Sequence, residues 1–158
     1  MLAVITPSGK GAVARFERKL DHGVEEVWAY LTENGKLQQW FPELHVDGLR
    51  EGGAIRFDMG NGAFEEMTIT GLSLHETLAF TWAEDHVRFE LSREPEGCRL
   101  TLIETIAAVT SHTPRDLAGW HVCLNVIGDL LDGKPGNTRR AEWEGWYREY
   151  ARLLEPLK

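Results

Sequence analysis

The sequence is poor in positive charge and in cysteine, and it lacks any long apolar run. It holds 17 lysines and arginines against 25 aspartates and glutamates, a formal net charge of −8. A chain with this charge repels nucleic-acid phosphates and anionic membrane surfaces. No window approaches the roughly 18 consecutive apolar residues of a membrane span, and the first residues lack the features of a signal peptide. We therefore expect a cytoplasmic protein with no nucleic-acid partner and no membrane insertion.

Motifs of familiar catalytic and metal sites are also missing. Cys98 and Cys123 cannot form a disulfide framework and have no zinc-binding spacing, and the six histidines are scattered. There is no nucleophile elbow, P-loop, dinucleotide fingerprint or zinc-protease motif. Glu65 and Glu66 are adjacent in an expected strand, so they point to opposite faces and form no catalytic pair. The sequence predicts no metal site, no cofactor and no catalytic residue, and it favours a non-enzymatic role.

The length and the apolar patterning predict one domain, residues 1–158, of the α+β class. After a flexible start, residues 12–20 alternate as a strand, and residues 23–41 show helical spacing with one interruption, which indicates two short helices. From there to residue 106 the apolar period is two. We expect an antiparallel meander with one apolar face, including a hairpin at Asn61-Gly62.

Two helices are expected after the meander. The first begins at Thr113-Pro114, ends before Gly133 and is long enough to cover the apolar face of a sheet. Residues 139–154 form a further packing helix, whose apolar face includes Trp143 and Trp146. That helix accounts for the apolar residues on the back of the first one, and a homodimer interface is the alternative.

Several segments resemble one known family. FERKLDHGVEEVWAYLTENGKLQQWF, DGLREGGAIRFDM, LAFTW and GWHVCLNVIGDLLDG are similar to segments of the domain found in the ATPase activator of the heat-shock protein 90 chaperone. The similarity runs from residue 12 to 133. His22-Gly23 stands where relatives often have Ala-Pro, and Asn125 stands where many have Asp, which weakens the transfer of any role to residue 125.

The resemblance places the chain in the START-like superfamily, together with the birch-pollen allergen fold, lipid-transfer domains and polyketide cyclases. It implies a helix-grip fold, in which a curved antiparallel sheet of six to seven strands wraps around a long C-terminal helix. Two short helices follow the first strand, and an extra helix follows the long one. In many relatives a cavity between sheet and helix holds an apolar molecule, but the scaffold supports several functions.

A cavity of this kind is lined by the inward side chains of the strands and helices. Aromatic walls with few polar groups are what an apolar ligand requires. The candidates are Trp28, Trp40, Phe57, Phe80, Trp82, Phe89, Leu102, Glu104, Trp120, His121, Leu124 and Ile127. The first hypothesis is therefore a binder of a small hydrophobic molecule. A chaperone-associated or other protein-interaction module, which predicts exposed tryptophans, is the second, and a cyclase-like or hydratase-like enzyme using Arg18, Glu104 or His121 is the third.

The helix stretch from residue 119 to 133 contains a tryptophan, a histidine and a cysteine close together. On a helical wheel Trp120 faces the sheet, while His121 and Cys123 lie about 160° apart around the axis. They cannot form a thiolate–imidazole pair. We expect His121 at the cavity rim, where a hydrogen bond to a neighbour is the simpler role, and Cys123 pointing elsewhere.

Two charged side chains fall on expected apolar faces. The strand register carries both Arg18 and Glu104 inward, where an unpaired charge is costly. A salt bridge between the two, or a bulge that turns Glu104 outward, is the favoured solution. The alternative is a raised pKa of Glu104 in a ligand cavity.

Overall fold

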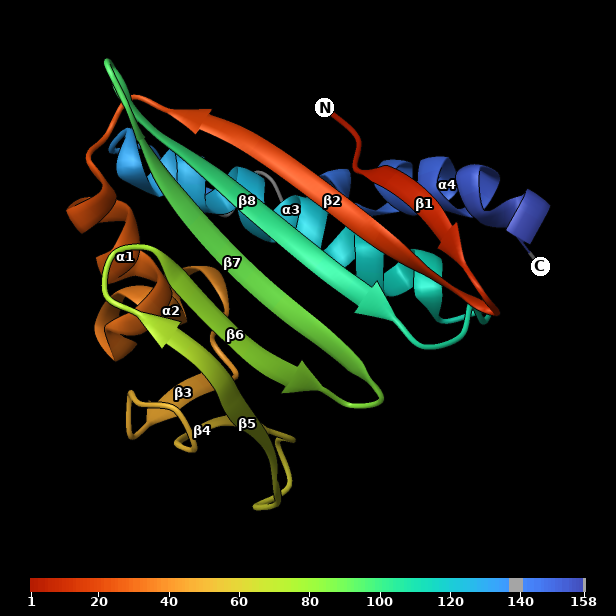
Figure 1. Cartoon of the computed structure of the whole chain (residues 1–158), viewed down its shortest axis with the longest axis horizontal. Helices are drawn as coiled ribbons and strands as arrows, with labels where there is room; N and C mark the ends of the chain where they lie inside the picture. The colour runs from red at the N-terminus through yellow and green to blue at the C-terminus, as the bar shows by residue number, and fades with distance from the viewer. Residues whose placement is uncertain (137–140, 158) are drawn as a thin grey trace.

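The structure is a computed structural model that describes residues 1–136 and 141–157. Its described part forms an eight-stranded sheet in the order β1-β2-β8-β7-β6-β5-β4-β3, with every neighbouring pair antiparallel. A long helix lies across one face of the sheet (Figure 1). The strands are β1 Val4–Ser8, β2 Gly11–Leu20, β3 Leu44–Asp47, β4 Ala54–Asp58, β5 Phe64–Ser73, β6 Thr77–Trp82, β7 Asp85–Glu94 and β8 Gly97–Ile106.

The α+β helix-grip prediction is confirmed, although two of the eight strands were not expected. The predicted flexible start is wrong, because β1 pairs with β2 along its whole length. Its side chains are mostly exposed, so it shows no buried alternation that a pattern could reveal. The short strand β3 pairs with β4 and directly follows the two short helices, where the sequence pattern is dominated by the end of the second helix.

The helices follow the predicted order. They are α1 Val24–Thr32, α2 Asn34–Trp40, α3 Thr113–Leu131 and α4 Trp143–Leu154, and a short 3-10 helix, η2 Glu155–Leu157, ends the described chain. Proline occupies the first turn of α3, and Gly133 follows its end with a φ of 76°, which suits the left-handed conformation after a helix. The predicted start of the last helix, at residues 139 and 140, lies outside the described residues.

The core lies between the sheet and α3. Inward residues of the strands, such as Phe16, Phe89 and Leu102, are buried together with Leu124 and Ile127 of α3. The back of α3 is covered by α4, as predicted, so its buried valines need no second copy of the chain. In Figure 1, α3 passes behind β2 and β8, and α4 lies beside β1. Within the described ranges, no helix combines the length and the apolar character needed to cross a membrane.

Candidate ligand pocket

A pocket of about 340 Å³ lies beside the first half of α3. Its walls come from the end of α2 and the residues after it, the end of β6, one side of α3 and the start of α4. We call it the tryptophan pocket. It is lined by Trp40, Phe41, Pro42, Glu43, Trp82, Asp116, Gly119, Trp120, Val122, Cys123 and Trp143.

Aromatic rings in mutual contact make up most of these walls. The ring centroids of Trp82 and Trp120 are 5.1 Å apart, and the Phe41 ring lies 5.9 Å from each of them. These tilted and edge-on arrangements are favourable for aromatic pairs. The charged residues in the lining, Glu43 and Asp116, are both acidic. The pocket therefore offers broad apolar faces with a negative edge.

Three of the twelve predicted cavity residues line the tryptophan pocket: Trp40, Trp82 and Trp120. Phe57, Phe80 and Phe89 stand behind them in ring-to-ring contact. Trp28, Leu102, Leu124 and Ile127 are buried in the core outside the lining. The centre of the space between sheet and helix is thus filled by side chains, and the open volume lies at its edge.

His121 lies away from the pocket, against α4, and is fully buried rather than placed at a cavity rim. Its Nδ1 is hydrogen-bonded to the Tyr150 hydroxyl at 2.7 Å, and that hydroxyl accepts the Ala3 N–H at 3.0 Å. The imidazole also stacks on Trp146, with the centroids 3.9 Å apart. Burial, then the charges of Arg18 and the N-terminus, lowers the pKa of His121 to about 3. The histidine is a neutral packing residue.

Cys123 was expected to point away from the cavity, and that prediction is wrong. The residue lines the tryptophan pocket, and its Sγ lies 3.9 Å from the Trp40 carbonyl oxygen. The helical wheel gives the direction of Cys123 relative to the sheet only. The pocket, however, lies between α3 and α2, and Cys123 is on the side of α3 that faces α2. Burial raises the pKa of the other cysteine, Cys98, to about 11, so that thiol is not reactive.

Sequence reasoning also missed lining residues contributed by segments that meet only in three dimensions. Phe41 and Glu43 come from the end of α2 and the residues after it, and Trp143 comes from α4. The helical pattern of each segment identified its apolar face but not the element that it faces. Asp116 is an acidic residue in the first turn of α3, a common feature of helix starts that carries no sign of a pocket.

Glu104 faces the interior, so the prediction of an outward bulge is wrong. The side chain is fully buried, and its neighbours across the sheet are Ala14 of β2 and Val87 of β7. The predicted salt bridge with Arg18 does not form. Arg18 lies opposite Leu100, about 13 Å along the strand from Glu104 at roughly 3.3 Å per residue, and it donates to the Glu17 carbonyl at 2.8 Å.

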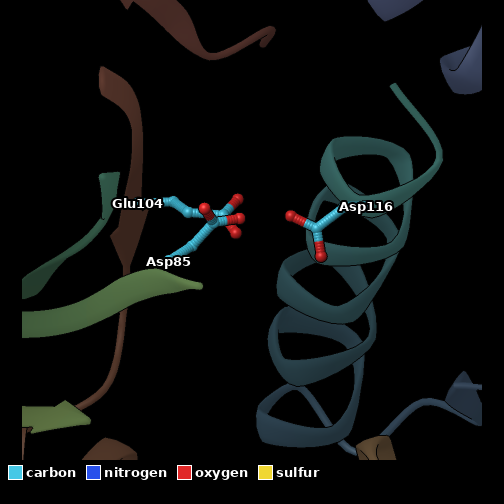
Figure 2. A group of neighbouring side chains, drawn as sticks. All are labelled: Asp85, Glu104 and Asp116. Carbon is cyan, nitrogen blue, oxygen red and sulfur yellow. The ribbon is translucent and has the colours of Figure 1, made fainter. Parts of the chain in front are cut away.

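Glu104 instead meets two other carboxyl groups, from Asp85 at the start of β7 and Asp116 in the first turn of α3 (Figure 2). One oxygen of each lies within 4.8 Å of the others. Burial, then its hydrogen bond with Asp116 and the nearby negative charges, holds the pKa of Glu104 well above its usual value. Burial also raises the pKa of Asp85. We call these three residues the carboxylate cluster.

Two N–H groups outside the carboxylate cluster donate hydrogen bonds to it and orient its aspartates. The Trp82 indole N–H donates to Asp116 Oδ1 at 3.0 Å, and the Ala107 backbone N–H donates to Asp85 Oδ1 at 2.9 Å. Asp116 also lines the tryptophan pocket, so the cluster adjoins the aromatic walls. His121, which the enzyme hypothesis named together with Arg18 and Glu104, does not lie near the carboxylate cluster.

A family model supplies the classification. The model described as Activator of Hsp90 ATPase homolog 1-like protein matches residues 21–132. The chain belongs to this family. Its resemblance to the START-like superfamily is thereby confirmed, and domains of this kind commonly bind small hydrophobic ligands. No curated protein matches the chain.

Solved structures related to this Hsp90 ATPase activator homologue-like chain support the same fold. A conserved protein of unknown function from Enterococcus faecalis is 26% identical, with a TM-score of 0.88 over 99% of this chain and 92% of that one. CalU16 from Micromonospora echinospora is 22% identical, with a TM-score of 0.76 over 97% of each chain. DynU16, from the dynemicin biosynthetic locus, is 25% identical, with a TM-score of 0.67 over 78% of this chain and 49% of its own.

Proposed function

We propose that the protein binds a small aromatic or apolar molecule in the tryptophan pocket. The observation that carries this proposal is the composition of the walls, in which four tryptophans and Phe41 surround about 340 Å³. Ligand sites are concave, mostly apolar and provided with a few polar groups that orient the ligand. Asp116, held by the Trp82 indole, supplies such a group.

The size and charge of the pocket narrow the ligand class. Ligand pockets span about 300 to 1,000 Å³, so this one is at the lower end and suits a compound of about one to three rings. A lipid with two acyl chains is too large. Because the charged lining residues are acidic, the pocket favours neutral or positively charged aromatic molecules over anions.

A variant that fills the pocket tests the proposal. Gly119 faces the pocket from α3, and a Cβ added there meets nothing within 4 Å. We expect Gly119→Leu to fold normally, since leucine is a better helix former than glycine, and to occupy the binding volume. Gly145→Leu is the matched control, because Gly145 is also helical and open but lies on the exposed side of α4.

Binding is measured by tryptophan fluorescence titration and native mass spectrometry against polyphenols, aromatic amines, fatty acids and sterols. The proposal predicts saturable one-to-one binding of compact aromatic compounds, at least tenfold weaker in Gly119→Leu and unchanged in Gly145→Leu. Binding that is equal in both variants, or none across the panel, contradicts it.

The other two hypotheses receive less support. The interaction-module hypothesis predicted exposed tryptophans, and none of the six is exposed: three are buried and three are half-buried. The enzyme hypothesis required at least two of Arg18, Glu104 and His121 to reach one molecule, yet His121 packs against α4 while Glu104 meets the aspartates. The cytoplasmic location stays a prediction from composition.

A further inference from the structure

The carboxylate cluster brings three acidic side chains together without a basic partner. In the part of the chain that the structure describes, no lysine or arginine forms an ion pair with Asp85, Glu104 or Asp116. Glu104 is fully buried, and apart from its contact with the Asp116 carboxyl group no described residue donates a hydrogen bond to its oxygens. A buried carboxylate in this state requires neutralisation.

We propose that Asp85, Glu104 and Asp116 bind a hard divalent cation of the Ca²⁺, Mg²⁺ or Mn²⁺ type. All the donor atoms are carboxylate oxygens, which these ions prefer, and no histidine or thiol takes part. Three oxygens within 4.8 Å of one another share a point no more than about 2.8 Å from each, so at most a small side-chain movement brings them to the roughly 2.1 to 2.5 Å of a bound ion. Figure 2 shows the three carboxyl groups turned toward one another across the space between the sheet and α3.

The hydrogen bonds around the cluster suit this role. Asp116 and Asp85 each use one oxygen to accept a bond, from the Trp82 indole and the Ala107 N–H, which leaves the other oxygen of each for an ion. Outer donors of this kind commonly orient metal-binding carboxylates. No N–H donor occupies either oxygen of Glu104, so both can face an ion once the proton shared with Asp116 is displaced. The chain thus offers up to four oxygens, and water or a ligand oxygen would complete the coordination.

The cluster is also accessible. Asp85 and Asp116 line a second opening of about 370 Å³ beside the turn between β6 and β7 and the segment before α3. A proton shared between Glu104 and Asp116 is the competing way to neutralise Glu104, but it does not account for the third carboxyl group, Asp85, within 4.8 Å of them. The cluster and the tryptophan pocket share Asp116, but binding of the ion can be measured without any aromatic ligand.

Titration with Mn²⁺, followed by calorimetry and electron paramagnetic resonance, tests the site directly, and Ca²⁺ serves as a competitor. We expect one Mn²⁺ per chain and a higher unfolding temperature in Mn²⁺ or Ca²⁺ than in EDTA. Glu104→Gln keeps the shape but removes the charge, and Asp116→Asn keeps an acceptor for Trp82. Each should raise the Kd at least tenfold and remove the thermal shift.

The matched control is Glu65→Gln, an exposed residue of β5 to which the same change is made. It should bind Mn²⁺ like the unmodified protein. No saturable binding by the unmodified protein, or equal binding by the Glu104 and Glu65 variants, overturns the proposal and leaves proton sharing as the explanation. Both results are independent of aromatic ligand binding, so failure here is distinct from failure of the proposed function.

Discussion

The buried polar groups on the two sides of α3 have different surroundings. On the side toward α4, His121 Nδ1 and Tyr150 join the Ala3 backbone in a chain of hydrogen bonds, and the neutral imidazole, whose Nε2 has no described hydrogen-bond partner, stacks on Trp146. On the side toward the turn between β6 and β7, Glu104 meets two further carboxyl groups and receives no donor from other described residues.

This difference separates a packing role from a binding role. Hydrogen-bonded polar groups contribute to stability, and removing one leaves its partner unsatisfied. Buried carboxyl groups that face one another destabilise the fold unless a proton or an ion joins them. His121 and Glu104 are therefore almost equally buried, yet we expect His121 to stabilise the fold and an unneutralised Glu104 to destabilise it. Three measurements test this difference.

Acidification gives the largest expected effect, on the α4 side. The pKa of His121 is about 3 in the fold and near 6.5 when unfolded, so the unfolded chain takes up a proton that the fold does not. The contribution of neutral His121 to the unfolding free energy is complete above pH 6.5 and is lost as the pH falls toward 3. Between pH 7 and 4 the unmodified protein should lose about 3 kcal/mol more unfolding free energy than His121→Asn.

Urea unfolding at each pH measures this loss. His22, whose pKa is raised chiefly by its hydrogen bond to Asp132, acts in the opposite direction, but it is present in both proteins and cancels. Parallel pH profiles for the two proteins would show that the imidazole is protonated within the fold.

Removal of the Tyr150 hydroxyl comes next. Tyr150→Phe leaves the Ala3 N–H and His121 Nδ1 without their partner in a buried place, which should cost about 2 kcal/mol. Tyr147→Phe is the control, because Tyr147 is half-buried and stacks on Trp143 through its ring. Urea unfolding at pH 7 compares the two, and equal losses would refute a specific role for the Tyr150 hydroxyl.

The smallest effect has the opposite sign and lies on the carboxylate side. Glu104→Gln removes an ionisable group from a buried place beside two aspartates, so in EDTA at pH 7 it should stabilise the fold by about 1 kcal/mol. Thermal and urea unfolding provide the measurement. A loss of 1 kcal/mol or more would place Glu104 among the structural residues, together with Tyr150.

The sequence predicted the helices, most of the sheet and the covering of α3 by α4, because each depends on a local period or an end signal. It missed β1, an edge strand whose exposed side chains show no alternation of burial. It identified Trp40, Trp82 and Trp120 as apolar residues of inward faces, and the structure places all three in the lining of the tryptophan pocket.

The remaining parts of the site depend on how separate elements dock. Cys123 reaches the pocket only because α2 lies on that side of α3. Asp85, Glu104 and Asp116 are far apart in the sequence, and each alone resembles an ordinary strand end, inward position or helix start. They meet because α3 packs against the ends of β7 and β8, and no local sequence pattern predicts that packing.

The most direct test of the contrast between the two sides is Mn²⁺ titration of the unmodified protein, Tyr150→Phe and Glu104→Gln under identical conditions. Tyr150→Phe should be less stable but should bind one Mn²⁺ with unchanged affinity. Glu104→Gln should be at least as stable in EDTA but should bind at least tenfold more weakly. If both variants bind equally well, or if no protein binds the ion, the division between a packing side and a binding side is contradicted.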